Sequence, residues 1–591
     1  MTAFSDLAKV VAVGPNLIEV ELTSTDEYQQ LEQKLQIGSY LKISDDEDAS
    51  LVAVVDGFRV RDSLGTDGVP TDPRFVLSLQ PVGRLENGKF YRGGKQITIP
   101  PQNVELAEND LLERIYSGEG ISSKFNFSTL VQDPSVEVSL DGDRFFGKHI
   151  GVVGSTGSGK SSTVAAIIQA ATEPTSDQVA RGVLNNSHVI IFDIHGEYST
   201  AFPDARVITA DDLNLPYWLM NSEELEELFI ESNEQNSHNQ VSQFRHAVIA
   251  NKQRHNRNMP VGQVSYDSPA YFSLEEVLQY IDNLNSEVIG RNPDEGLPKS
   301  SDPNIGRAGL IDSREQIYFG QKVPFVESSQ AAGKKATAGP FAGEFNRFLM
   351  RLESRRADRR LDFLLSPKNG EGQVFQTEDM DRLISQFMGF EDDAQANVTI
   401  LDLSGIPFEV LSVVVSLVAR LVFTFSFHFK KLHAADEAEL PFLLVFEEAH
   451  NYIPQNSSAR FNSVKKSIER VAKEGRKYGV SLMIVSQRPS EVSETVFSQC
   501  SNFVAMRLTN PADQNYVKRL LPDDLGALTN SLASLEQREA VIIGDAIVLP
   551  SLVRVNPITQ LPRSMDVNFH AAWQEDWAHR AFEGVIDRWR R

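Results

Sequence analysis

Short runs of alternating apolar and polar residues cover the first 108 positions of the chain, which is the pattern of β-strands with one buried face. Glycine, proline and asparagine separate these runs at 14–16 and 86–88, where turns are expected. The expected strands are residues 9–13, 17–22, 39–43, 51–55 and 74–79. Short strands with regular turns predict a small β-barrel over residues 1–108.

Beyond residue 108 the pattern changes to continuous apolar runs that end in polar residues, as in the buried strands of a parallel sheet. Such runs end at Asp193, Asp402, Glu447 and Gln487. They predict an α/β core in two parts, residues 109–217 and 395–560.

Two further segments have helical periodicity. Residues 218–394 are polar with apolar positions at helical spacing, and they predict a mainly helical insertion between the two parts of the core. Residues 561–591 place three of the four tryptophans on one helical stripe. So much aromatic surface must pack either on the chain's own core or on a neighbouring subunit.

The composition is that of an ordinary soluble protein, with 41% hydrophobic and 23% charged residues. A chain of 591 residues is too long for one core, so several folding units are expected. The single cysteine, Cys500, excludes an intramolecular disulfide and fits a reducing cytoplasm. The first residues lack a basic and apolar leader, so no secretion signal is expected. The most apolar stretch, residues 413–429, contains Arg420 and His428, which favours a buried helix over a membrane span.

A complete phosphate-binding loop, Gly154-x4-Gly159-Lys160-Ser161, lies between an apolar approach and an apolar run that predicts a helix. Its glycines allow successive backbone N–H groups to converge on phosphate oxygens, and the helix adds its positive end. Lys160 is expected to reach the β- and γ-phosphates of ATP, and the Ser161 hydroxyl to ligate Mg²⁺. The expected nucleotide-binding residues are Gly154, Ser155, Thr156, Gly157, Ser158, Gly159, Lys160, Ser161 and Ser162.

Two adjacent carboxylates, Glu447 and Glu448, end the buried-strand run of residues 441–446. A parallel strand delivers its carboxyl end to the ligand crevice. There, one carboxylate can hold Mg²⁺ and the next can polarise an attacking water. We assign Glu447 to the metal, through water because its side chain is longer than that of the usual Asp, and Glu448 to the attacking water.

Three more polar residues are candidates for the same site. Gln487 ends the strand run 480–486 and is placed to sense the γ-phosphate or the attacking water. Arg476 lies on the corner before that run, where it could project into a neighbouring subunit's site as an arginine finger. Arg470, on the preceding helix, is the alternative finger.

The strand run ending at Asp193 is followed closely by Glu197. Either carboxylate could orient Mg²⁺-bound water or Lys160, and either could equally hold the loop that contains them. The sequence leaves both roles open.

Five segments together resemble the HerA group of FtsK/HerA-type translocases. They are GSTGSGKSS at 154–162, DIHGEY at 193–198, ILDLSGIP at 400–407, VFEEAHNYIP at 445–454 and GRKYGVSLMIVSQRPSEVSETVFSQC at 475–500. Their order and spacing match the group over about 150–220 and 395–560, and the N-terminal stretch resembles the HAS-barrel that precedes the motor in HerA relatives.

The resemblance implies a RecA-like core in a hexameric ring that hydrolyses ATP with Mg²⁺ and threads double-stranded DNA through its central pore. It implies the roles given above for Lys160, Ser161, Glu448, Gln487 and Arg476, and a C-terminal helix that braces the adjacent subunit. Relatives work with a NurA-type nuclease or, in bacterial antiviral operons, with an effector such as a sirtuin-type NADase or a nuclease. The chain contains no nuclease, NADase or protease motif of its own.

Several functions stay open on this basis. The first is a cytoplasmic DNA-translocating motor that serves a partner effector in antiphage defence, and the second is an ATPase ring that assembles and regulates such an effector without processive movement. A NurA-partnered motor for resecting DNA ends is a further alternative. A secretion or conjugation ATPase is disfavoured because no membrane segment is expected.

The net charge of −24 sets a condition on any of these functions that involves DNA. Phosphate binding needs local positive charge, so the outer surface is not expected to bind DNA tightly. Arginines gather at 347–360, and Lys252, Arg254 and Arg257 form a smaller group. Contact with DNA, contact with another subunit and a solvated face are all open for these groups.

Overall fold

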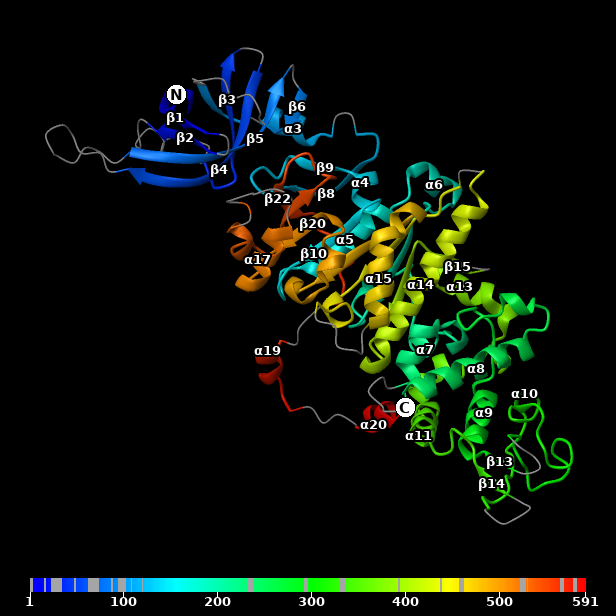
Figure 1. Cartoon of the computed structure of the whole chain (residues 1–591). Coiled ribbons are helices and arrows are strands. Elements are labelled where there is room, and N and C mark those ends of the chain that lie inside the picture. Colours follow the sequence, from blue (N-terminus) through cyan, green and yellow to red (C-terminus); the bar gives the residue numbers. More distant parts are fainter. Residues whose placement is uncertain are drawn as a thin grey trace.

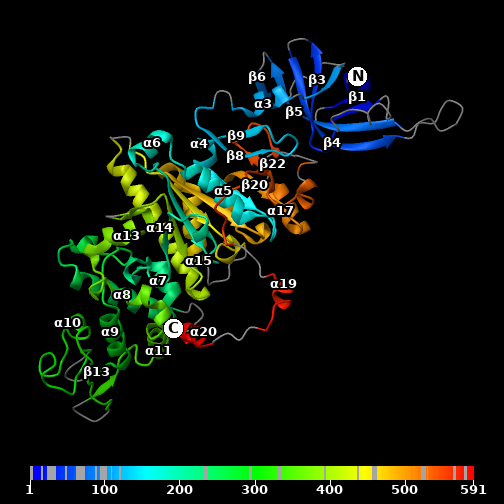
Figure 2. The same ribbon diagram turned by 180° about the vertical axis from the view of Figure 1, so that it is seen from behind.

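The computed structural model describes residues 4–14, 17–22, 35–46, 49–61, 74–86, 89–93, 103–107, 109–118, 121–230, 237–291, 296–329, 335–391, 394–435, 438–455, 462–520, 528, 530–563, 568–577 and 582–590. Over these residues the chain forms two large sheets, a helical region and a C-terminal tail. The larger sheet lies between the N-terminal sheet and the helical region in both views of the molecule (Figures 1 and 2).

The larger sheet has a parallel half that contains the predicted buried strands. In the described residues its order is β12-β17-β11-β18-β19-β10-β20-β21-β22-β8-β9. The parallel strands are β12 (Arg206–Ile208), β17 (Val398–Asp402), β11 (His188–Asp193), β18 (Phe442–Phe446), β19 (Val480–Ser486), β10 (His149–Val153) and β20 (Cys500–Met506). The antiparallel strands are β21 (Glu539–Gly544), β22 (Ser551–Val555), β8 (Lys124–Leu130) and β9 (Glu137–Asp141). The predicted α/β fold class is confirmed.

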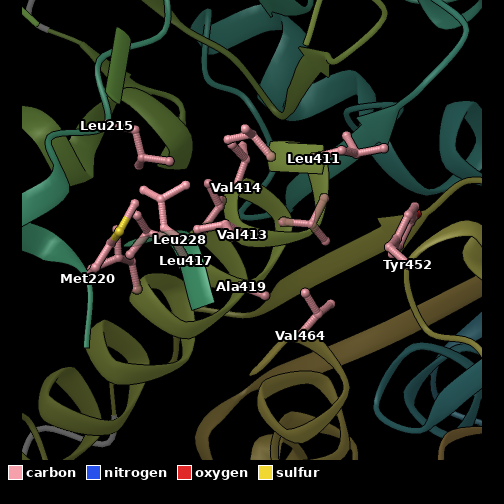
Figure 3. Close-up of a cluster of buried hydrophobic side chains, with 14 of the residues drawn as sticks. Leu215, Met220, Leu228, Leu411, Val413, Val414, Leu417, Ala419, Tyr452 and Val464 are labelled. Atoms are coloured by element: carbon pink, nitrogen blue, oxygen red, sulfur yellow. The ribbon is translucent and has the colours of Figure 1, made fainter. Parts of the chain in front are cut away.

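Apart from the edge strand β12, both faces of the parallel strands are buried, which explains their apolar sequence. Along β18, Leu444 and Phe446 belong to one core, whereas Leu443 and Val445 belong to the other. Helix α5 (Lys160–Thr172) contributes to the second core, and helices α14 (Phe408–Leu432) and α15 (Asn462–Glu474) to the first. Figure 3 shows side chains of the first core converging from these two helices and from residues 215–228.

Helix α14 is the apolar stretch expected to be a core helix. An 18-residue window within Val410–Leu432 has a mean hydropathy of 2.2, so by length and composition this segment could cross a membrane. However, 78% of that apolar window is buried inside the protein. The apolar composition is therefore accounted for by packing against the sheet and the helical region.

A buried ion pair joins α14 to helix α7 (Ser222–Phe229) of the helical region. The guanidinium of Arg420 donates to both carboxylate oxygens of Glu224, at 3.1 and 2.8 Å, and to the carbonyl of Leu219 at 2.6 Å. Ser416 donates to the same carboxylate at 3.1 Å. The Glu224 side chain is fully buried, so these bonds replace all of its hydration.

The N-terminal residues form a second sheet, of order β1-β2-β5-β4-β3-β7 with β6 paired to β5. Its strands are β1 (Ala8–Val13), β2 (Ile18–Leu22), β3 (Tyr40–Asp46), β4 (Ala49–Arg61), β5 (Arg74–Glu86), β6 (Lys89–Arg92) and β7 (Asn103–Leu106). All five predicted strands are present. The buried hydroxyl of Tyr116, in helix α3 (Asn109–Tyr116), contacts Tyr40 of this sheet at 2.7 Å and Ser551 of the larger sheet at 2.6 Å.

The region between β12 and β17 is mainly helical, as its sequence pattern predicts. Its longer helices are α7, α8 (Ser237–His255), α9 (Leu274–Ser286), α11 (Asn346–Arg356) and α13 (Met380–Met388). Two short pairs of strands interrupt them: β13 (Val288–Gly290) with β14 (Ala336–Ala338), and β15 (Phe390–Glu391) with β16 (Ala394–Gln395). Apolar residues of these helices belong to the same core as α14 and one face of the parallel sheet. The helical region therefore shares a core with the sheet.

The tail differs from the single helix that its sequence pattern suggests. It contains two short helices, α19 (Phe569–Trp573) and α20 (Glu583–Arg590). The large apolar side chains along it are exposed, with Trp577 at 89% and Trp589 at 86% of full exposure. Helices this short are marginal without tertiary packing, which accounts for the interrupted helix.

The Arg420 contacts generate a prediction about stability. In Arg420→Met the Glu224 carboxylate stays buried without its partner, so we expect the protein's free energy of unfolding to fall by about 3–5 kcal/mol. Urea denaturation followed by circular dichroism measures this loss. Arg181→Met is the control, because Arg181 pairs with Asp177 on the surface and both side chains are more than half exposed. Equal unfolding midpoints for the two variants would contradict a structural role for the buried pair.

Candidate functional site

The phosphate-binding loop has the predicted setting between β10 and α5. Gly157 and Gly159 have φ values of 75° and 95°, a backbone conformation that favours glycine. A Cβ at Gly154 would lie 2.6 Å from Ser158 Oγ and 2.9 Å from Met506 Cβ, so a side chain there would displace the loop. Lys160 begins α5 and is 92% buried, so its ammonium group lies within the site.

Several polar atoms of the loop fit a phosphate ligand. The hydroxyl of Ser158 is buried and has no hydrogen-bond partner in the described part of the chain. Lys160 supplies a cation for the phosphates, and Ser161 supplies a hydroxyl for the metal ion. Binding of Mg²⁺-nucleotide uses both groups. Among the described residues, no group of three or more His, Cys, Asp or Glu side chains could hold a metal ion.

The loop is also tied to the ends of the neighbouring strands. Thr156 donates its hydroxyl proton to the side-chain oxygen of Gln487 at 2.6 Å. On the other side, the Ser155 hydroxyl accepts from the backbone N–H of Thr509 at 3.0 Å. The structure therefore brings Gln487, which follows β19, directly to the phosphate-binding loop.

Glu447 and Glu448 follow β18, at the carboxyl edge of the parallel strands. Burial of the carboxyl, and secondarily repulsion from the Glu448 carboxylate, raise the pKa of Glu447 to about 8. The Tyr198 hydroxyl donates to its carboxylate at 2.8 Å. The Tyr452 hydroxyl donates to its backbone carbonyl at 2.6 Å. Glu447 is thus enclosed on several sides.

Glu448 has the left-handed backbone conformation, with φ 46° and ψ 49°, which is strained for a residue with a side chain. One of its carboxylate oxygens accepts from the backbone N–H of Gln487 at 3.4 Å and lies 3.3 Å from Nδ1 of His450. Burial lowers the pKa of His450, so this imidazole favours its neutral form. The strained turn aims Glu448 at Gln487, beside the loop that Gln487 contacts.

The loop after β11 separates the roles of its two acids. The Asp193 carboxylate accepts backbone N–H groups from His195, Gly196 and Tyr198 at 3.2, 2.9 and 2.9 Å, so it fixes the turn. Burial raises the pKa of this carboxyl. The Glu197 carboxylate instead accepts the Ser161 hydroxyl at 3.1 Å. Of the two, only Glu197 contacts the phosphate-binding helix in this way.

Arg476 lies at the opposite edge of the sheet from the phosphate-binding loop. It precedes β19, whereas Gln487 follows it, and a seven-residue strand spans about 20 Å. Arg476 is exposed and lines a cavity of about 710 Å³ at this amino edge, together with the first residues of β11, β18 and β19. Arg470 lies on α15, stacked 5.3 Å from the Phe423 ring centroid. Arg476 therefore cannot reach its own chain's loop without a large movement.

Three residues that sequence reasoning missed also belong to this site. Tyr198 and His450 lie within two of the segments that resemble the HerA group, so the same segments could have marked these two residues as candidates. Arg507 follows β20 and lies beside the loop, with Nη2 3.5 Å from the carbonyl of Gly157. Its Nε is buried and has no partner among the described residues. Nothing in the local sequence around Arg507 marks it.

The arrangement combines a phosphate cradle, a buried lysine and a cluster of carboxylates at one edge of the sheet. Such a site can bind a nucleoside triphosphate, neutralise its phosphates and activate water beside them. Solved structures with related folds include VirB4 of Thermoanaerobacter pseudethanolicus, at 12% identity and a TM-score of 0.44, covering 74% of this chain and 98% of that one.

Sequence relatives are more informative. The chain is 25% identical over 552 residues to the DNA double-strand break repair helicase HerA of Pyrococcus furiosus, covering 87% of this chain and 82% of the relative. It is 25% identical over 572 residues to the probable DNA double-strand break repair helicase HerA of Methanocaldococcus jannaschii, covering 92% and 96%.

Two family models match the chain. The model described as the central domain of helicase HerA matches residues 125–422, and the model described as the helicase HerA-like C-terminal region matches residues 368–564. The first alone spans just over half of the chain and includes the phosphate-binding loop. Together with the site geometry, these matches show that the chain belongs to the HerA helicase family and is an ATP-hydrolysing enzyme.

Proposed function

We propose that this protein is a HerA-type motor, a hexameric ring that couples ATP hydrolysis to movement along double-stranded DNA in its central pore. The observation that carries the proposal is that the phosphate-binding loop and the carboxylates lie at one edge of the sheet, whereas the candidate finger, Arg476, lies at the opposite edge of the same sheet. The names of the relatives, which are DNA double-strand break repair helicases, support DNA as the substrate.

In the proposed mechanism each residue acts from its observed position. The loop N–H groups and Lys160 would neutralise the β- and γ-phosphates, and Ser161 and Glu447 are the residues that would hold Mg²⁺, Ser161 by its hydroxyl and Glu447 through water. Glu448 orients the attacking water and accepts its proton, while Gln487 links Glu448 to the loop through the contacts described above. The Mg²⁺ ion supplies charge compensation for the phosphates when bound.

The ring completes the site in this proposal. A subunit that presents its amino edge to the carboxyl edge of its neighbour would place Arg476 opposite the neighbour's γ-phosphate. Its planar guanidinium can pair with two phosphate oxygens as charge develops. Arg470 is the alternative, but its stacking on Phe423 and its 3.7 Å approach to Glu474 engage it within its own chain.

One arginine of each basic group reaches the same turn of the helical region. Lys252 does not belong to this surface, because it is fully buried and donates to the carbonyls of Tyr266 and Ser268 at 2.7 Å. Arg254 and Arg356 lie 3.7 Å from the neighbouring residues Glu276 and Glu275 in the first turn of α9. The surface around that turn is a candidate for contact with DNA phosphates. The other two possibilities, contact between subunits and a solvated face, remain competing assignments for it.

The remaining parts of the chain have proposed roles in assembly. Residues 1–108 would form a HAS-type barrel, supported by the contact between its end strands β1 and β7, and would dock the partner. Residues 109–217 and 395–560 would make a RecA-like core around the 218–394 insertion. Residues 561–591 would brace the adjacent subunit, which would cover the exposed tryptophans.

The proposed partner is an effector enzyme, either a nuclease or a sirtuin-type NADase, in cytoplasmic antiphage defence. The second candidate function is an ATPase scaffold that assembles and regulates such an effector without processive movement. The net charge of −24 favours this alternative, because it weakens binding of DNA to the outer surface. A NurA-type partnership in DNA end resection is a third candidate.

The first prediction separates binding from hydrolysis. Lys160→Ala should abolish ATP turnover because it removes the cation from the phosphates. Glu448→Gln should retain nucleotide binding and lower turnover by about 100-fold or more, since it removes the carboxylate that acts on water. Phosphate release and fluorescent-nucleotide binding measure the two effects. Wild-type turnover in Glu448→Gln would refute the assignment of the catalytic carboxylate.

The second prediction tests the action of Arg476 on a neighbour. Arg476→Ala and Lys160→Ala subunits should each be inactive alone, and rings mixed from both should recover part of the activity. Recovery is expected because some interfaces then pair an intact loop with an intact arginine. Native mass spectrometry verifies the mixing. Mixed rings without any recovery would exclude Arg476 and direct the same experiment to Arg470.

The third prediction distinguishes a motor from a scaffold. Double-stranded DNA should raise ATP turnover several-fold, and the protein should displace a triplex-forming strand from duplex DNA only when ATP is hydrolysed. Glu448→Gln is the matched control, because it binds nucleotide without turnover. ATP hydrolysis that is insensitive to DNA, with no strand displacement in the presence of the effector, would favour the scaffold.

A further inference from the structure

The Ser161 hydroxyl already has an acceptor for its proton, and that acceptor is not one of the paired acids at the end of β18. It donates to Oε2 of Glu197 at 3.1 Å. A hydroxyl that offers a lone pair to a metal must direct its proton elsewhere. A carboxylate at this place keeps the hydroxyl in the orientation that a metal ion needs.

Glu447 is engaged differently. Its Oε2 accepts the Tyr198 hydroxyl at 2.8 Å, and its side chain is enclosed, with the whole residue 3% exposed. Glu197 is half-buried, as is Ser161. Of the two carboxylates, Glu197 has the more open position from which to accept hydrogen bonds from metal-bound water.

We propose that Glu197 orients Ser161 and is the principal carboxylate for the water shell of Mg²⁺ in this site, with Glu447 making the weaker contribution through water. In the same proposal, Tyr198 positions Glu447, so that two consecutive residues of one loop serve two different acids of the site. Glu197 is a positioning residue, because it acts through Ser161 and through water. The inference rests on the proposed Mg²⁺·ATP chemistry of the site and does not depend on DNA or on the ring.

The loop that carries Glu197 is fixed from two sides, as a positioning role requires. On the inner side, Asp193 accepts three backbone N–H groups of the turn. On the outer side, the Glu197 carbonyl accepts the Arg563 N–H at 2.7 Å, and Thr200 donates to the Leu561 carbonyl at 2.8 Å. The beginning of the C-terminal tail therefore holds the back of this loop.

Hydrogen bonds from a side chain of α5 also hold the loop after β11 and the start of the tail. The side-chain amide of Gln169 donates to the carbonyls of Ala201 and Gln560, each at 2.9 Å. The phosphate-binding helix, the loop after β11 and the root of the tail thus form one hydrogen-bonded unit. Preorganisation of this kind lets a carboxylate act on a metal's water shell without a cost of reordering.

The test is the Mg²⁺ dependence of nucleotide binding by the full chain without DNA, followed with a fluorescent ADP analogue. Glu197→Gln keeps the side chain's shape and an oxygen acceptor but removes its charge. We expect the Mg²⁺ concentration for half-maximal enhancement of binding to rise about 10-fold or more. Affinity in excess EDTA should be unchanged, because the phosphate cradle is intact.

Two matched variants complete this experiment. Glu173→Gln, an exposed acid at the other end of α5, should behave as wild type. Glu447→Gln should shift the Mg²⁺ dependence less than Glu197→Gln does. An unshifted Glu197→Gln protein, or a larger shift in Glu447→Gln than in Glu197→Gln, would overturn the proposal.

A double-mutant cycle separates positioning from simple stabilisation of the loop. If Glu197 acts through Ser161, Glu197→Gln should add little further Mg²⁺ shift to Ser161→Ala. Fully additive shifts, or a lower thermal unfolding midpoint with unchanged Mg²⁺ dependence, would contradict the proposal. Since DNA is absent from these measurements, a failure of the translocation experiment would leave their outcome intact.

Discussion

The whole site depends on the burial of a parallel sheet on both faces. Because β10, β18, β19 and β11 can be buried only side by side, their carboxyl ends meet at one edge. The phosphate-binding loop, the paired acids, Gln487 and the loop of Glu197 come from segments up to about 300 residues apart in the sequence. Hydrophobic burial along the strands is what holds these polar groups together.

The opposing force is the cost of crowding carboxylates in a partly buried place. Asp193, Glu197, Glu447 and Glu448 lie around one lysine, and burial raises the pKa of each of the first three. The chain offsets this cost with specific donors: backbone N–H groups on Asp193, the Tyr198 hydroxyl on Glu447 and the Ser161 hydroxyl on Glu197. Each acid has different donors, which is a physical reason to expect different roles.

The helical region and the tail extend this site in opposite ways. The helical region shares the core of α14 and is joined to it by the Glu224–Arg420 pair, so it cannot move independently at little cost. The tail begins on the back of the Glu197 loop and then leaves the core with its tryptophans exposed. A partner that covered those tryptophans would therefore bind a segment whose beginning is hydrogen-bonded to the Glu197 loop.

The sequence by itself determined the elements and the chemistry that local spacing encodes. The spacing of Gly154, Lys160 and Ser161 predicts a phosphate-binding loop, because it allows the backbone to turn around a phosphate. Apolar runs predicted the buried strands β11, β17, β18 and β19, because a strand whose two faces are both covered has a continuous apolar sequence. The alternation of residues 1–108 likewise predicted the five strands from 9 to 79.

Tertiary structure decided which polar groups share a site and which partner each one has. Asp193 and Glu197 are equivalent in sequence, and only the turn after β11 separates a loop-fixing acid from one that reaches Ser161. Arg507 carries no local signal, because its place beside Gly157 follows from the pairing of β20 with β10. Hydrogen-bond partners are set by distances across the fold, and the distance between such segments is not encoded in the local sequence of either.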